Sequence, residues 1–83
     1  MFKTENNRIY MENDAGEMVA EITFPETEPG IFTINHTFVD DSLRGQGIAS
    51  KLVQAATDEI KAKGGTVKAT CSYARSWLEK RQA

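Results

Sequence analysis

The feature that most constrains the fold is a pair of glycines between a strand-like run and a helix-like run. The segment Arg44-Gly45-Gln46-Gly47-Ile48-Ala49 follows alternating apolar residues that end near Val39, and an amphipathic helix is predicted from about Ile48. Two glycines within three positions allow a tight turn and a close approach of the backbone to a ligand. The first N–H groups of a helix lack intrahelical partners and, with the helix dipole, suit a phosphate or pyrophosphate. The same glycines also fit a purely structural turn, so the local motif alone leaves both interpretations open.

Length and charge limit the classes of function. The chain has 83 residues, which predicts a single domain over residues 1–83 with an open groove for any ligand rather than a large enclosed cavity. The apolar (40%) and charged (27%) fractions are typical of a soluble globular domain. A net charge of −2 argues against nucleic acid and anionic membranes as partners. No run approaches the ~20 apolar residues of a membrane span, and the first residues do not resemble a signal peptide, so we expect a cytoplasmic protein.

The chain has one cysteine, Cys71, and one histidine, His36. This composition is incompatible with an internal disulfide framework or a structural zinc site of Cys and His ligands. The carboxylates Asp40-Asp41 form an isolated pair without the spaced ligands of a calcium loop, and they are interpreted as a solvated, turn-forming pair. We therefore predict no metal.

Periodicity predicts the element order β-β-β-α-β-α. The elements are strands at Arg8–Asn13, Glu17–Phe24 and Ile31–Val39, a helix from about Ile48 to the stop signal Gly64-Gly65, a strand at Thr66–Cys71 and a short helix capped by Ser72. The first three strands should be antiparallel, and the third should be central because it is apolar on both faces. The segment from Ile31 to Cys71 should then be a right-handed crossover that joins two parallel strands. In this α+β mixed sheet the glycine turn lies at the carboxyl end of the central strand, where a ligand is expected.

Two common phosphate-binding motifs do not fit the turn. In a dinucleotide-binding fold a third glycine would stand where the chain has Ser50, and an acid would end the next strand where Cys71 stands. An ATP-binding P-loop would require Gly-Lys-Ser or Gly-Lys-Thr, which the chain lacks.

The turn resembles the signature of the GNAT superfamily of acetyl-CoA-dependent N-acetyltransferases, which is Arg or Gln, two residues, Gly, one residue, then Gly or Ala. Arg44, Gly47 and Ala49 match it, and the similarity extends from about Ile31 to Leu78. The runs Asn35-His36-Thr37 and Cys71-Ser72-Tyr73-Ala74, with the short length, are more closely similar to a minimal subfamily of stand-alone acetyl-CoA-binding domains. The chain departs from full-length members in having no room for the segments that usually build the acceptor pocket, and in having Asp41 where many relatives have proline.

This resemblance implies that the chain binds acetyl-CoA or coenzyme A, with turn amides on the pyrophosphate and an unidentified amine as acceptor. It also implies that the central strand and the next parallel strand splay apart, which leaves backbone N–H groups near Phe38 and Val39 for the thioester or the pantetheine. The implied cofactor-binding residues are Phe38, Val39, Arg44, Gly45, Gln46, Gly47, Ile48 and Ala49.

Three side chains are candidates for the chemistry of acetyl transfer. His36 has an unperturbed pKa of about 6.5, which suits a base, although it could instead pack within the strand. Cys71 precedes a predicted helix N-terminus and could accept the acetyl group with His36 as its base, or be a small buried residue. Tyr73 could protonate the departing thiolate or form an aromatic pair with Trp77 over the groove.

Three hypotheses of function follow. The first is an acetyl-CoA-dependent acyltransferase, in which transfer is direct or passes through Cys71. The second is a non-catalytic module that binds acetyl-CoA or coenzyme A. The third is a small interaction domain with a purely structural glycine turn. The oligomeric state is not predicted.

Overall fold

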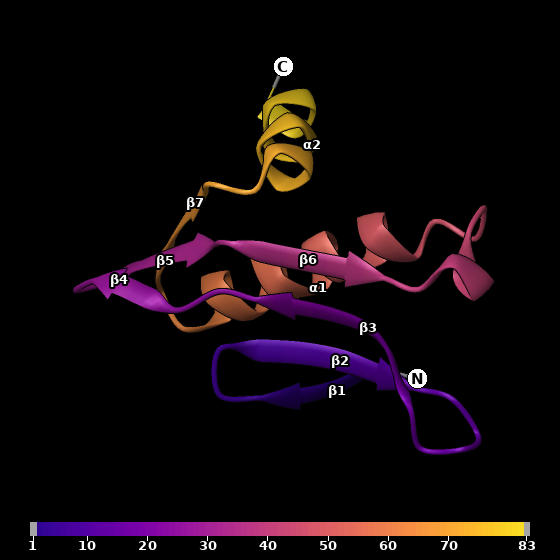
Figure 1. Ribbon diagram of the computed structural model, residues 1–83. Coiled ribbons are helices and arrows are strands. Elements are labelled where there is room, and N and C mark those ends of the chain that lie inside the picture. Colours follow the sequence, from indigo (N-terminus) through magenta and orange to yellow (C-terminus); the bar gives the residue numbers. More distant parts are fainter. Residues whose placement is uncertain (1, 83) are drawn as a thin grey trace.

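The computed structural model describes residues 2–82, which form seven strands, two α-helices and one 3-10 helix (Figure 1). The strands are β1 (Phe2–Glu5), β2 (Arg8–Glu12), β3 (Met18–Thr23), β4 (Glu26–Glu28), β5 (Ile31–Ile34), β6 (His36–Val39) and β7 (Thr66–Ala69). The helices are η1 (Asp41–Leu43), α1 (Ile48–Ala62) and α2 (Ser72–Gln82). The predicted α+β class is therefore confirmed.

The strands form two sheets. Antiparallel strands make a four-stranded sheet in the order β1-β2-β3-β6, while β4, β5 and β7 make a three-stranded sheet. In the second sheet β5 and β7 are parallel, with Ile31 opposite Thr66 and Ile34 opposite Ala69. The segment β5-β6-α1-β7 is thus a crossover between parallel strands, as the periodicity predicted.

The prediction of one continuous strand over Ile31–Val39 was wrong, because the chain changes sheets at Asn35. Its N–H donates to the Thr23 carbonyl (3.2 Å), although the register partner of Thr23 is His36. Asn35 and His36 therefore both lie opposite Thr23 on β3, which is the arrangement of a β-bulge. Before the bulge β5 pairs with β7, and after it β6 pairs with β3.

The two short strands β1 and β4 were not predicted. Strand β1 pairs with β2 through a turn at Asn7, which has φ of 60°, and three of its four residues are exposed. All three residues of β4 are exposed, and the strand pairs with β5. Neither strand has the apolar alternation that marks a half-buried strand, and each forms because a neighbouring strand offers it backbone hydrogen bonds.

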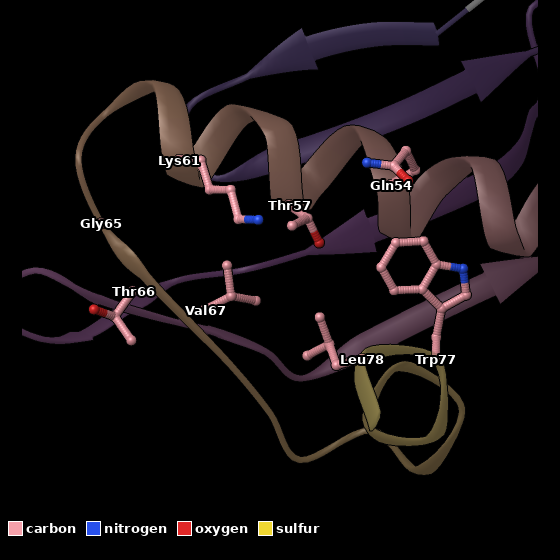
Figure 2. Close-up of a pocket in the computed structure, with 8 residues that line it drawn as sticks. All are labelled: Gln54, Thr57, Lys61, Gly65, Thr66, Val67, Trp77 and Leu78. Atoms are coloured by element: carbon pink, nitrogen blue, oxygen red, sulfur yellow. The ribbon is translucent and has the colours of Figure 1, made fainter. Parts of the chain in front are cut away.

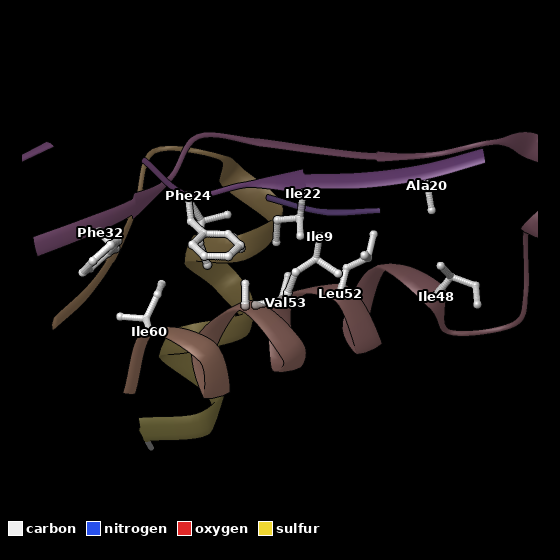
Figure 3. Close-up of a cluster of buried hydrophobic side chains, with 12 residues drawn as sticks. Ile9, Ala20, Ile22, Phe24, Phe32, Ile48, Leu52, Val53 and Ile60 are labelled. Carbon is white, nitrogen blue, oxygen red and sulfur yellow. The ribbon is translucent and has the colours of Figure 1, made fainter. Parts of the chain in front are cut away.

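Helix α1 covers one face of the sheets and closes the core (Figure 3). The predicted apolar face is confirmed, because Leu52, Val53, Ala56 and Ile60 have no exposed surface. These side chains pack against a cluster from the strands that contains Ile9, Ala20, Ile22, Phe24, Phe32 and Ile34. The opposite face of the β1-β2-β3-β6 sheet carries the alternate side chains and is not covered by a helix.

Helix α2 begins one residue earlier than predicted. The Cys71 carbonyl accepts from the Arg75 N–H (2.9 Å), so Cys71 occupies the N-cap and Ser72 is the first helical residue. The helix packs against β7 and α1, with Ala74 buried and the Trp77 side chain half-buried. Figure 1 shows α2 following directly after β7. Its N-terminus is thereby held beside the carboxyl end of β7.

Candidate functional site

The glycine turn forms a hollow at the N-terminus of α1. Gly47 is the N-cap in the left-handed conformation (φ 69°, ψ 23°), and Gly45 also has positive φ (84°). The Lys51 N–H makes the first helical bond, to the Gly47 carbonyl (3.2 Å), so the N–H groups before it have no intrahelical partner. The hollow measures about 230 Å³ and is lined by Val39, Asp40, Asp41, Leu43, Arg44, Gly45, Gly47, Ile48, Ala49, Ser50 and Tyr73.

Most of the predicted cofactor-binding residues meet in this hollow, but two lie outside its lining. The Gln46 N–H is directed back to the Leu43 carbonyl (3.4 Å), and Phe38 projects from the neighbouring strand with 37% of its surface exposed. The hollow has the size and the exposed N–H groups that suit one pyrophosphate.

Charges at the mouth of the hollow are already paired. The Asp40 carboxylate caps η1 by accepting from the Ser42 hydroxyl (2.6 Å) and N–H (3.0 Å), and these two bonds lower the pKa of Asp40. The interpretation of Asp40 as a turn-forming residue is thus confirmed. The Arg44 guanidinium pairs with Asp41 at 2.7 Å, and both side chains are more than 80% exposed (81% and 87%). An incoming phosphate would compete with Asp41 for Arg44.

Strand β6 has a free backbone edge that leads away from the turn. The Asp40 N–H donates to the Val19 carbonyl on β3 (2.8 Å). Backbone groups alternate along an antiparallel pair, so Phe38 also faces β3, while the N–H groups of Val39 and Thr37 face the other way. Among the described strands nothing pairs with that second edge. The free N–H group is therefore that of Val39 rather than that of Phe38, while the Thr37 N–H is directed to the Cys71 thiol.

Cys71 lies beside this edge of β6. Its Sγ is 3.7 Å from the Thr37 hydroxyl oxygen, and its place at the N-cap directs it toward the first N–H groups of α2. Partial burial raises the pKa of the thiol, but hydrogen bonds from the Ala74 N–H, the Thr37 hydroxyl, and the N–H groups of Tyr73 and Thr37 together outweigh it. The net effect lowers the pKa of Cys71, as expected for a thiolate at a helix N-terminus.

His36 lies on the opposite face of the sheet from Cys71. Successive residues of a strand alternate in direction, so the imidazole projects from the open face while the neighbouring Thr37 side chain turns toward Cys71. The imidazole Nε2 is 3.5 Å from one oxygen of Glu21, whose other oxygen pairs with Arg8. The structure thus brings His36 to Glu21 and gives it no contact with Cys71.

Tyr73 and Trp77 share one face of α2 and border the glycine turn. Tyr73 is 43% exposed and lines the turn hollow, while the Trp77 Nε1 donates to the Ser50 hydroxyl (2.8 Å) at the start of α1. A second hollow of about 380 Å³ continues along α2, lined by Ser72, Tyr73, Ser76, Trp77 and Lys80. This geometry fits the predicted aromatic pair, and it also leaves the Tyr73 hydroxyl accessible.

The roles of two residues in this region were not predicted from the sequence. Thr37 supplies the hydroxyl and the N–H beside Cys71, and Ser50 accepts the bond from Trp77. Only their places in the fold reveal these roles, because threonine in a strand and serine in a first helical turn are common in structural positions.

The part of the chain that the structure describes contains no group of three or more His, Cys, Asp or Glu residues that could hold a metal ion. Neither of its two α-helices is long and apolar enough to cross a membrane.

Comparisons with known proteins agree with this fold. A family model described as GCN5-related N-acetyl-transferase matches residues 8–83. The solution structure of a GCN5-like protein from Staphylococcus aureus shares 33% identity, with a TM-score of 0.79 over 98% of this chain and 79% of the other. A search of curated proteins found no match.

Two larger enzymes show the same fold at lower identity. Glucosamine-6-phosphate N-acetyltransferase from Arabidopsis thaliana is 21% identical (TM-score 0.66, 92% of this chain), and ribosomal-protein-alanine N-acetyltransferase from Brucella melitensis biovar Abortus is 22% identical (TM-score 0.63, 88% of this chain). The chain spans 58% of the length of each. The family match over nearly the whole length confirms the resemblance seen at Arg44, Gly47 and Ala49. The chain belongs to the GCN5-related N-acetyltransferase family.

Proposed function

We propose that the chain is an acetyl-CoA-dependent N-acetyltransferase that passes the acetyl group through Cys71 to an amine. The observation that carries the proposal is one continuous path, from the pyrophosphate-sized hollow at Gly47, along the unpaired edge of β6 at Val39 and Thr37, to the Cys71 thiol. An extended pantetheine chain can add to such a strand edge through backbone hydrogen bonds. The thioester would then lie beside the sulfur whose pKa is lowered.

In the first step the Cys71 thiolate attacks the thioester carbonyl carbon. A new bond forms from that carbon to Sγ as its bond to the coenzyme A sulfur breaks, and the Val39 N–H donates to the carbonyl oxygen as negative charge develops on it. The departing thiolate takes a proton from the Tyr73 hydroxyl, which recovers one from solvent. The N–H groups at the N-cap favour the attacking thiolate, so this step requires no imidazole base.

In the second step a neutral amine attacks the acetyl group on Cys71 at the free edge of β6. The Cys71 thiolate leaves as the amide forms, and the amine nitrogen gives up its proton to solvent. His36 is not assigned as the base of this step, because its imidazole lies on the other face of the sheet from Cys71, 3.5 Å from Glu21.

A non-catalytic acetyl-CoA-binding module is the second candidate function. The observation in its favour is the solvent-open face around His36, where no described element forms walls around an amine. Such a module would use the same turn and strand edge but would not release coenzyme A.

Mass spectrometry and thiol release separate these candidates. The protein is incubated with acetyl-CoA, its mass is measured, and free coenzyme A is followed with a panel of small primary amines. We expect one acetyl group per chain, amine-dependent release, and loss of both in Cys71→Ser, whose hydroxyl still caps α2. Release that persists in Cys71→Ser would establish direct transfer, and binding without release would establish the module.

A further inference from the structure

A larger hollow lies on the other side of the contact between the two helices. It measures about 500 Å³ and is bounded by the C-terminal half of α1, the start of β7 and the second turn of α2 (Figure 2). None of its lining residues lines the hollow at the glycine turn. The proposed acetyl transfer therefore makes no use of this space, whose volume is within the usual range for small-molecule sites.

One side of the hollow is apolar. Figure 2 shows the indole of Trp77 and the side chain of Leu78 reaching from α2 toward Thr57 on α1 and Val67 on β7. Val67, Trp77 and Leu78 are all only half-buried, so apolar surface remains open there. An aromatic or aliphatic group placed between them would remove that surface from water.

The opposite side of the hollow carries an unpaired positive charge. Lys61 is exposed and turns its ammonium group along α1 toward Thr57 (Figure 2), and within residues 2–80 its side chain has no hydrogen bond or ion pair. The nearby acid Asp58 accepts from the Gln54 amide (2.9 Å). The carbonyls at the end of α1 are satisfied by the N–H groups of the turn at residues 63–65, which weakens their attraction for Lys61.

The remaining polar groups of the lining can accept hydrogen bonds. The Thr57 hydroxyl donates to the Val53 carbonyl (2.8 Å), so its oxygen keeps a free lone pair, and the Gln54 carbonyl has no donor among the described residues. The Lys61 ammonium and the aromatic wall match an anion with an apolar body. The two neutral acceptors cannot bond to the anion itself and suit water or an N–H or O–H group on that body.

We propose that this hollow binds a small organic carboxylate with an aromatic or aliphatic body. The carboxylate pairs with Lys61, and the body lies between Trp77, Leu78 and Val67. Such a ligand bridges α1 and α2, so it stabilises the folded chain. The site is additional to the acetyl-CoA site and does not depend on the proposed function.

Amide NMR titration tests this proposal without acetyl-CoA or turnover. The probe is phenylacetate, the control ligand is 2-phenylethylamine, and the chain's single tryptophan makes the Trp77 indole N–H signal unambiguous. We expect saturable shifts at the Trp77 indole, Thr57 and Val67, a higher Tm with phenylacetate, and much weaker shifts with the amine. In Lys61→Gln the dissociation constant for phenylacetate should rise about five-fold.

Lys68→Gln is the matched control, because Lys68 follows Val67 on β7 and points to the other face of the strand. This variant should bind phenylacetate like the unmodified protein. The proposal is overturned if phenylacetate gives no saturable shifts, if Lys61→Gln binds it equally well, or if the amine binds as tightly as the acid.

Discussion

Replacing Gly47 with alanine separates the ligand-binding role of the glycine turn from its structural role. Gly47 has φ of 69°, and a Cβ built on it meets no atom within 4 Å, so the variant meets backbone strain but no clash. Strain of this kind costs about 1–2 kcal/mol. For 83 residues, an unfolding entropy of about 2.1 cal/mol/K per residue converts that cost into a fall in Tm of about 6–12 °C. The variant should therefore remain folded at 25 °C.

The effect of Gly47→Ala on acetyl-CoA binding should be larger. Its methyl group stands on the turn whose N–H groups face the hollow, and it prevents the close approach of a pyrophosphate. Each charge-assisted hydrogen bond that is lost costs about 1.5–3 kcal/mol, so affinity should fall roughly 10- to 100-fold or more. Calorimetric titration with acetyl-CoA measures this loss, and thermal unfolding by circular dichroism measures the stability.

Gly16→Ala is the matched control for strain. Gly16 has φ of 81° with open space around it, and it lies in the hairpin between β2 and β3, away from the hollow. We expect a similar fall in Tm and unchanged affinity for acetyl-CoA. Unchanged affinity in Gly47→Ala, or equal losses of affinity in both variants, would refute the assignment of the turn as the pyrophosphate site.

Further predictions concern the thiol, the charge pair at the turn and the end of α1. The pKa of Cys71 is lower in the folded chain, so its alkylation by iodoacetamide should reach half-maximal rate at a lower pH than in urea; equal midpoints would contradict the N-cap contacts. By linkage, these contacts stabilise the fold as pH rises toward the unfolded pKa, and the gain is lost as pH falls through the folded pKa. Asp41→Asn frees Arg44 and should tighten acetyl-CoA binding on the order of two- to five-fold in calorimetry, an effect that high salt should reduce. Gly65→Ala places a Cβ 2.7 Å from the buried Phe32 ring and should cost about 1–3 kcal/mol in urea unfolding, and an unchanged midpoint would show that the ring yields freely.

Much of the fold followed from periodicity because each long element buries one regular face. The face of α1 that contains Leu52 and Ile60 was predicted from its spacing, and the residues after it gave the correct stop at Gly64-Gly65. The break at Asn35 was not predictable in this way. Apolar residues continue on both sides of it, and the contacts found at the break are long-range, since the Ile34 carbonyl accepts from the N–H groups of Thr70 and Cys71.

The candidate site was predicted where it depends on backbone conformation and missed where it depends on long-range contacts. Positive φ at Gly45 and Gly47 agrees with their expected role in the turn. His36 pairs with Glu21 and not with Cys71 because the His36 and Thr37 side chains lie on opposite faces of β6, and Thr37 is the one near Cys71. The bulge at Asn35 sets which of the two residues occupies which face. The pattern of apolar residues does not predict such a shift in register.

The central claim is that acetyl-CoA extends from the glycine turn to Cys71, and amide chemical-shift mapping during an acetyl-CoA titration tests it most directly. The account predicts that the amides of Gly47, Val39 and Thr37 shift together with a single dissociation constant, while Gly16 does not move. Shifts that are absent, or that avoid both the turn and the free edge of β6, would contradict it.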